Sequence, residues 1–157
     1  MKALSLELHA LSIAKASNDP EVKEWALQLI NSNIAKLMMR RFNNERKAIC
    51  YLKKNLDCKF RYVQQYTRLQ LAKLYFDRNN YHGVVDLLTV LYEQEGSKFD
   101  ITDKEQEMFG RFIFVISLLT IKEKKRAEYQ IPFLQHLCDV FNSAGGNNLL
   151  EKIRDCF

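Results

Sequence analysis

The sequence predicts an all-α fold of seven or eight helices, and three observations support this prediction. The 157 residues include only 5 Gly and 2 Pro, too few for a strand fold, which would need turn residues about every 8 to 12 positions. Leu, Lys, Glu, Ala, Gln and Arg, which favour helices, are abundant along the chain. Apolar side chains recur at three- and four-residue spacing between short polar segments, which indicates amphipathic helices.

Length and composition predict one folded domain. Apolar residues make up 47% of the chain and charged residues 27%, which is typical of a soluble globular protein. A chain of 157 residues can enclose one core but hardly two. We therefore expect residues 1–157 to form a single helical domain, either alone or as a piece of a longer protein.

Polar segments and capping residues set the expected helix boundaries. Asp19 can cap the second helix, with Pro20 in its first turn, where a missing N–H costs nothing. Thr102 and Glu105 have the spacing of a capping box at the start of the sixth helix. The expected helices span residues 3–16, 20–41, 45–56, 60–78, 81–94, 103–122, 124–141 and 149–155.

Breaker residues near the end of the chain predict two interruptions. Pro132 lies inside the seventh helix, where it removes a hydrogen bond and is expected to kink or split that helix. Gly145-Gly146 predicts a loop over residues 142–147. The last helix is expected to dock its apolar residues Leu149, Leu150 and Ile153.

Two apolar stretches are expected to be buried. The nearly apolar run from Phe112 to Leu119 is too short to span a bilayer, which needs about 20 residues, so we interpret it as a core helix. The second helix carries a stripe that we expect to face the core: Val22, Trp25, Ala26, Leu29, Ile30, Ile34, Leu37 and Met38.

A short self-similarity indicates a helical repeat. The segment Ile34-Ala35-Lys36-Leu37-Met38 aligns with Leu71-Ala72-Lys73-Leu74-Tyr75, 37 residues later, and an Asn-Asn turn follows each copy. Residues 68–94 resemble the unit of the tetratricopeptide repeat family, and residues 30–54 resemble it weakly. The positions that match the family pattern, and that the resemblance assigns to packing between helices, are Leu71, Ala72, Tyr75, Tyr81 and Leu88.

The resemblance implies successive antiparallel helical hairpins in a right-handed array. The chain departs from the family pattern at Val84 and Leu91, where alanine is preferred, and at Arg68, where tryptophan is frequent. Two other interpretations stay open. The repeated segment is also consistent with the core stripe of an ordinary helical bundle, and residues 68–81 are similar to the helical arms of proteasome-lid-type subunits.

The predicted function is a non-enzymatic scaffold for protein–protein interaction. Arrays of helical hairpins present a concave surface, built from the first helix of each unit, that binds peptide segments or partner subunits. Polar positions on the first helices are our candidates for this surface: Lys36, Arg40, Lys73 and Asp77. Apolar surface left at the ends of so short an array also allows association between copies of the chain.

The stretch from residue 36 to residue 78 is strongly basic. It holds 12 Lys and Arg against 3 acidic residues, although the whole chain has a net charge of only +5. Such a surface suits an acidic protein partner, or nucleic acid bound through its phosphates, or solvent alone. The candidate basic surface comprises Arg41, Arg46, Lys47, Lys53, Lys54, Lys59 and Arg61.

Residues for catalysis or metal binding are not grouped in the sequence. His9, His82 and His136 lie far apart, and no nucleophile motif surrounds them. Gly145-Gly146 lacks the lysine and the following Ser or Thr of a phosphate-binding loop. Carboxylate pairs such as Glu105 with Glu107 are expected on solvated surface. We therefore predict no enzyme activity, no cofactor and no metal site.

The cysteines and the first residues predict a reducing intracellular compartment. Four cysteines without clustered spacing are expected to be free and mostly buried thiols: Cys50, Cys58, Cys138 and Cys156. The first 20 residues have no apolar core or cleavage site of a signal peptide, because Glu7 and His9 interrupt them. We expect a cytoplasmic protein without a membrane segment.

Overall fold

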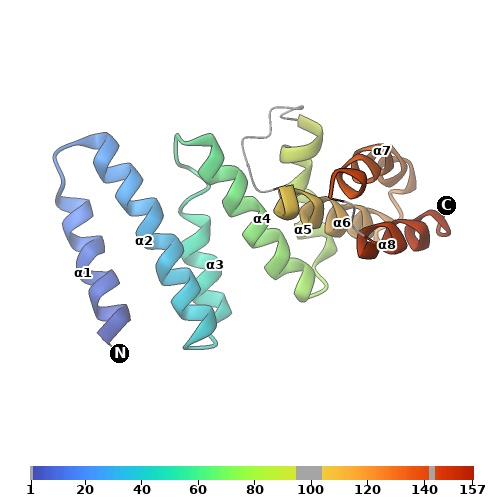
Figure 1. The fold of residues 1–157 in the computed structure, drawn as a ribbon. Helices are drawn as coiled ribbons and strands as arrows, with labels where there is room; N and C mark the ends of the chain where they lie inside the picture. The colour runs from blue at the N-terminus through green and yellow to red at the C-terminus, as the bar shows by residue number, and fades with distance from the viewer. Residues whose placement is uncertain (1, 95–103, 142–143) are drawn as a thin grey trace. The chain divides into compact units, whose positions relative to one another are not determined.

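The computed structural model describes residues 2–94, 104–141 and 144–157 (Figure 1). These residues form eight α-helices and one π-helix and contain no strand, which confirms the all-α prediction. The elements are α1 (Lys2–Ala16), α2 (Pro20–Arg40), α3 (Glu45–Lys53), α4 (Arg61–Asp77), α5 (Tyr81–Thr89), the π-helix η1 (Val90–Gln94), α6 (Lys104–Thr120), α7 (Lys124–Val140) and α8 (Ala144–Arg154).

The chain divides into two compact units, residues 1–67 and residues 68–157, with the boundary inside α4. In the first unit, α1 and α3 both pack against α2. In the second unit, α5 packs against α6, α6 against α7, and α7 against α8. Packing between helices that are adjacent in sequence is common to hairpin repeats and to ordinary bundles. The arrangement as a tetratricopeptide-like array therefore stays a prediction.

The start of α2 forms as the sequence predicts. The Asp19 carboxylate accepts hydrogen bonds from the backbone N–H groups of Glu21 at 2.9 Å and Val22 at 3.1 Å. Pro20 occupies the first turn, where its missing N–H needs no partner. Asp19 thus satisfies two of the donors that a helix start leaves unpaired.

Both predicted Asn-Asn turns are confirmed, and the two asparagines of each turn have different roles. Asn43 and Asn79 have φ values of 46° and 58°, a left-handed conformation that asparagine tolerates better than most residues. Asn44 and Asn80 then cap α3 and α5 through side-chain oxygens that accept from the backbone N–H groups three residues later, each at 3.1 Å. The turns can be short because two adjacent asparagines both end one helix and start the next.

Helix α6 supplies much of the core of the second unit. Phe112, Ile113, Phe114, Val115 and Leu118 are all buried, which confirms the predicted core helix. The ring of Phe114 lies 5.5 Å from the ring of Tyr92 in η1, a distance typical of packed aromatic pairs.

Small residues allow close packing around α4 and α5. Leu71, Ala72 and Leu88 have no exposed surface. A Cβ atom added at Gly83 would lie 2.6 Å from Cδ2 of Tyr75, which is too close for two carbon atoms. The approach of α5 to this part of α4 therefore depends on a glycine as well as on buried apolar side chains.

Of the two predicted effects of Pro132, a split of the seventh helix is wrong, because α7 continues through Pro132, and a kink stays a prediction. Proline removes the hydrogen bond to the carbonyl four residues earlier, which belongs to Glu128. Both Pro132 and Glu128 are exposed, so water can satisfy that carbonyl. The proline is tolerated because it lies on the solvent side of the helix.

The predicted loop at Gly145-Gly146 is also wrong, since α8 begins at Ala144 and includes both glycines. Two glycines in a helix cost about 1 kcal/mol each relative to alanine. Burial of Leu150 and Ile153, at 1% and 4% exposure, offsets this cost. Leu149, predicted to dock with them, is 38% exposed.

Other predicted boundaries differ in detail. Helix α3 ends at Lys53 rather than near residue 56, because Asn55 leaves the helical path and its side chain bonds to α2. The predicted capping box at Thr102 and the predicted helix end at residues 95–98 lie outside the described residues. Helix five extends to Gln94 as predicted, but its last turn is the π-helix.

All four cysteines are free, but only half of them are buried, so the prediction of mostly buried thiols is wrong for the other two. Cys50 and Cys156 are exposed. Cys58 and Cys138 are buried, and burial raises the pKa of both thiols because it disfavours the charged thiolate.

Candidate functional site

Three of the eight residues of the apolar stripe of α2 are exposed rather than part of the core, which corrects the sequence prediction. Val22, Trp25 and Leu29 are 54%, 52% and 49% exposed. Ile30 and Ile34, on another side of the same helix, are buried. The three exposed residues follow i, i+3, i+7 spacing and so share one face, which α1 and α3 leave uncovered although both pack against α2.

A groove runs beside this face. Its volume is about 250 Å³, and the start of α4 forms its second wall. Tyr62 of that wall is 49% exposed. The α2–α4 groove is lined by Trp25, Gln28, Leu29, Ser32, Asn33, Lys36, Tyr62, Val63 and Tyr66. All of these residues belong to the first unit.

Gln28 is the unusual residue of the groove. Its side chain is 5% exposed, yet neither its amide nitrogen nor its amide oxygen has a hydrogen-bond partner among the described residues. A buried polar group without a partner costs about 1–3 kcal/mol, and nearly all such groups in folded proteins are paired. Gln28 also lines a second hollow between α1 and the α3–α4 connection, which includes Asn31 and Asn55.

The neighbouring buried amides of Asn31 and Asn55 both form hydrogen bonds, in contrast with Gln28. Asn31 donates to the side-chain oxygen of Asn55 at 3.1 Å. Asn55 donates in turn to the backbone oxygen of Gln28 at 3.1 Å and to the hydroxyl of Ser32 at 3.0 Å. The backbone oxygen of Gln28 therefore has a partner, while the two donors and the acceptor oxygen of its side-chain amide have none among the described residues.

The predicted partner-binding residues are all exposed, and one of them lines the groove. Lys36 contributes to the α2–α4 groove, while Arg40, the last residue of α2, does not. Lys73 and Asp77 lie in the second unit, where the ammonium of Lys73 lies 5.4 Å from the ring centre of Phe109.

The residues assigned to repeat packing are buried or half-buried. Leu71, Ala72 and Leu88 are buried, and Tyr75 and Tyr81 are half-buried. Tyr81 packs edge-on against Phe76, with ring centres 5.8 Å apart, across the turn between α4 and α5. Their burial is consistent with a packing role and equally with a core role in an ordinary bundle.

The candidate basic surface is solvent-accessible, but some of its charge is engaged. Lys59 lies 3.4 Å from the carboxylate of Glu21 and 3.7 Å from that of Glu24. The ammonium of Lys54 lies 4.4 Å from the ring centre of Tyr51. The half-buried member is Arg61, and the exposed members are Arg41, Arg46, Lys47, Lys53, Lys54 and Lys59.

A charged cluster in the second unit stabilises its own members. Glu107, predicted on solvated surface, is instead buried and accepts from Lys104 at 2.8 Å and from Arg111 at 3.4 Å. The guanidinium of Arg111 lies 4.3 Å and 4.9 Å from the ring centres of Tyr92 and Phe133. Burial raises the pKa of the Tyr92 phenol well above its usual range. These internal pairs explain why a carboxylate can be buried here.

The central residues of the groove were not predicted as binding residues, although the sequence of α2 contains one signal for them. At about 100° per residue, the predicted stripe of α2 covers about 220° of the helix circumference. A surface helix of a globular protein usually needs an apolar arc of only about 100°. The excess arc, which includes Trp25, indicated a second contact face.

Two further findings concern the described part of the chain as a whole. Its helices include none with the length and apolar character needed to cross a bilayer. Within the same residues, His, Cys, Asp and Glu side chains form no group of three or more that could hold a metal ion.

Comparisons of the chain with protein-family models, with curated proteins and with solved structures gave no significant match.

Proposed function

We propose that the protein is a non-enzymatic interaction module whose first unit binds a polypeptide segment in the α2–α4 groove. One observation carries the proposal: an unpaired, buried amide at Gln28 lies among half-exposed aromatic side chains. Trp and Tyr are the residues that most often dominate binding energy at protein interfaces. A glutamine amide can both donate to a peptide carbonyl and accept from a peptide N–H.

The size and polarity of the groove support a peptide over a small metabolite. About 250 Å³ is below the usual range of about 300–1,000 Å³ for small-molecule sites, but it accommodates a single side chain. Trp25 and Tyr62 provide apolar contact area, and Lys36 adds one positive charge. We therefore expect the ligand to anchor one apolar side chain, to bond Gln28 with its backbone, and to place an acidic residue near Lys36.

Selection from a peptide library tests this proposal. A phage-displayed library of random 12-residue peptides is selected on the protein, and enriched peptides are measured by fluorescence polarisation. We expect dissociation constants in the micromolar range and a loss of at least about tenfold in Trp25→Ala and Tyr62→Ala. Ile13→Ala is the matched control, because Ile13 is an exposed apolar residue of α1 outside the groove. Equal affinity for all variants would refute the proposal.

The rival function is nucleic-acid binding by the candidate basic surface, which is favoured by the exposure of Arg41, Arg46 and Lys47 around the α2–α3 turn. A 20-nucleotide single-stranded RNA is measured at about 50 and 200 mM salt. Micromolar affinity that falls steeply with salt, and is lost in Arg46→Glu/Lys47→Glu but kept in Trp25→Ala, would favour the rival.

A further inference from the structure

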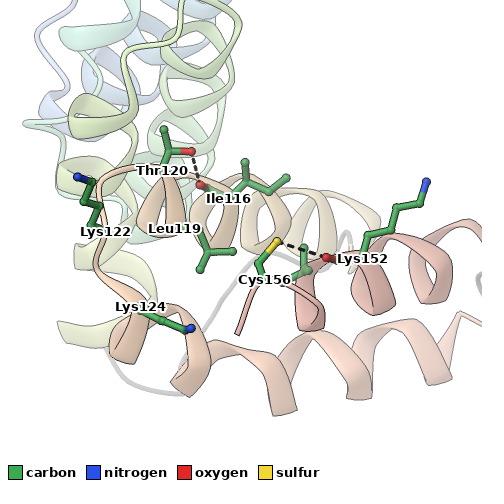
Figure 2. A pocket seen from close by; sticks show the side chains of 8 residues that line it. Ile116, Leu119, Thr120, Lys122, Lys124, Lys152 and Cys156 are labelled. Carbon is green, nitrogen blue, oxygen red and sulfur yellow. Dashed lines mark hydrogen bonds between the residues drawn. The ribbon is translucent and has the colours of Figure 1, made fainter.

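A second recess lies in the second unit, between α6, the α6–α7 turn and α8 (Figure 2). Its volume is about 650 Å³. Figure 2 shows Lys122 and Lys124 near one end and Lys152 near the other, with Leu119 and Cys156 between them. We call it the lysine-rimmed recess, and it is lined by Ile116, Leu119, Thr120, Lys122, Lys124, Lys152, Ile153 and Cys156.

The middle of the recess is apolar. Ile153 is 4% exposed, and Ile116 and Leu119 are half-buried. The two uncharged polar side chains of the lining each bond to a backbone oxygen four residues earlier. The Thr120 hydroxyl donates to the backbone oxygen of Ile116 at 2.7 Å, and the Cys156 thiol to that of Lys152 at 3.4 Å. A ligand therefore meets apolar atoms here and need not replace any hydrogen bond.

The rim of the recess is positively charged. Its lining includes three lysines and no Asp or Glu, since Glu123, next to Lys122, does not line it. Lys124 donates to the backbone oxygen of Phe157. Lys122 and Lys152 are exposed and form no ion pair with the described residues. Lys122 also has a φ of 68°, a conformation that favours glycine or asparagine over lysine.

We propose that the lysine-rimmed recess binds an amphipathic acidic segment of a partner protein. An apolar side chain of that segment lies against Ile116, Leu119 and Ile153, and Asp or Glu residues on either side of it pair with Lys122 and Lys152. Charge complementarity identifies the occupant, because every charged group of the lining is a cation. This site is independent of the α2–α4 groove and belongs to the other unit.

Two other partners fit the recess less well. Single-stranded nucleic acid is usually held by aromatic side chains on which the bases stack, and no aromatic residue lines the recess. An anionic membrane would contact lysines on a flat or protruding surface, whereas the apolar residues here line a recess. Both partners are outcomes of the test below.

A counter-selection isolates this site. Phage-displayed 12-residue peptides are selected on the Trp25→Ala protein and depleted on the same protein carrying Lys122→Gly and Lys152→Glu. Lys122→Gly suits the left-handed turn, so it removes the charge without straining the backbone. We expect enriched peptides with Asp or Glu flanking an apolar residue. They should bind wild type and Trp25→Ala equally and bind the lysine variant at least about tenfold more weakly.

Lys125→Glu is the control for charge alone, because Lys125 is an exposed α7 lysine outside the recess, and it should change the affinity less than twofold. Enriched peptides without acidic residues, or with equal affinity for the lysine variant, would overturn the proposal. The proposal would also be overturned if a 20-nucleotide RNA or phosphatidylserine vesicles bound more strongly than the peptides and the lysine variant abolished that binding. These results do not depend on whether the α2–α4 groove binds a peptide, since Trp25 is already replaced in the protein used for selection.

The two exposed thiols provide a second, internal readout. Cys156 lines the recess, whereas Cys50 lies in α3 of the first unit. Alkylation by iodoacetamide is followed for each cysteine by mass spectrometry, with and without the best acidic peptide at saturation. We expect the peptide to slow modification of Cys156 at least about fivefold and to leave Cys50 unchanged. Equal rates at Cys156 with and without peptide would contradict binding in the recess.

Discussion

Helices α2 and α6 carry apolar residues at similar density but use them differently. α6 buries Phe112, Ile113, Phe114, Val115 and Leu118, so most of its apolar surface is covered within its own unit. α2 keeps one apolar face about half exposed, at Trp25 and its neighbours, and buries an unpaired amide instead. An apolar stripe therefore identifies helix surface that is buried against another element. It does not indicate whether that element belongs to the same chain or to a partner.

The largest test of this difference removes one aromatic side chain from each helix. Phe114 has no exposed surface, so Phe114→Ala should lower the free energy of unfolding by about 3–5 kcal/mol. Trp25→Ala removes a side chain that is half exposed, and should cost no more than about 1.5 kcal/mol. Urea denaturation measures both. A similar loss of unfolding free energy in both variants would contradict this difference between α2 and α6, because Trp25 would then act as a core residue.

A second test extends the comparison to α4. Ala72 is fully buried, so Ala72→Leu overpacks its site and should lower the free energy of unfolding by about 1–3 kcal/mol, or about 4 °C of melting temperature per kcal/mol. Lys73→Leu is the control on the same helix, because Lys73 is exposed, and should change stability by less than about 0.5 kcal/mol. If Ala72→Leu leaves stability unchanged or raises it, Ala72 does not have the predicted role in repeat packing.

A third test concerns the amide of α2. Gln28→Met keeps the unbranched shape and removes two unpaired polar atoms, so it should raise the free energy of unfolding by about 1 kcal/mol. Asn31→Met should lower it by about 1–3 kcal/mol, because it leaves Asn55 short of a partner. Thermal denaturation compares the two variants. Destabilisation by Gln28→Met would show that Gln28 has a partner in the free protein.

The smallest expected effect is the pH dependence of stability that Tyr92, packed against α6, produces. The pKa of Tyr92 is raised by burial, so the folded state keeps its proton while the unfolded state loses it above about pH 10. The contribution of Tyr92 to the free energy of unfolding is fully present below about pH 10. It decreases as the pH rises, by up to about 1.4 kcal/mol per pH unit. Tyr92→Phe should make the decrease between pH 10 and 11.5 shallower in urea denaturation. An unchanged slope would contradict ionisation of Tyr92 on unfolding.

Local structure was predictable where one residue type has a clear physical preference. Asp19 and the Asn-Asn turns were predicted because their side chains satisfy backbone donors that any helix start leaves unpaired. The core run of α6 was predicted because it is apolar on all sides. The errors at Pro132 and at Gly145-Gly146 have the opposite origin: solvent exposure in one case and burial of neighbouring leucine and isoleucine in the other outweighed a local preference.

The candidate sites were mostly not predictable, because they depend on which faces remain uncovered. Of the predicted partner-binding residues, Lys36 lines the α2–α4 groove. Trp25 was predicted to lie in the core. Gln28 was not predicted as a site residue, because a glutamine on a helix is usually exposed. Lys122 and Lys152 lie 30 residues apart in the sequence, and only the fold of the second unit brings both to one recess.

The packing of each helix against a sequence neighbour also affects how the chain folds. Several helices that pack together are joined by short connections, such as residues 17–19 between α1 and α2 and residues 121–123 between α6 and α7. Closing short loops costs little entropy, and proteins rich in local contacts fold in about microseconds to milliseconds. A ribosome-bound chain can thus pair α6 with α5 before α8 is synthesised, which shortens the time during which the apolar residues 112–118 are open to aggregation.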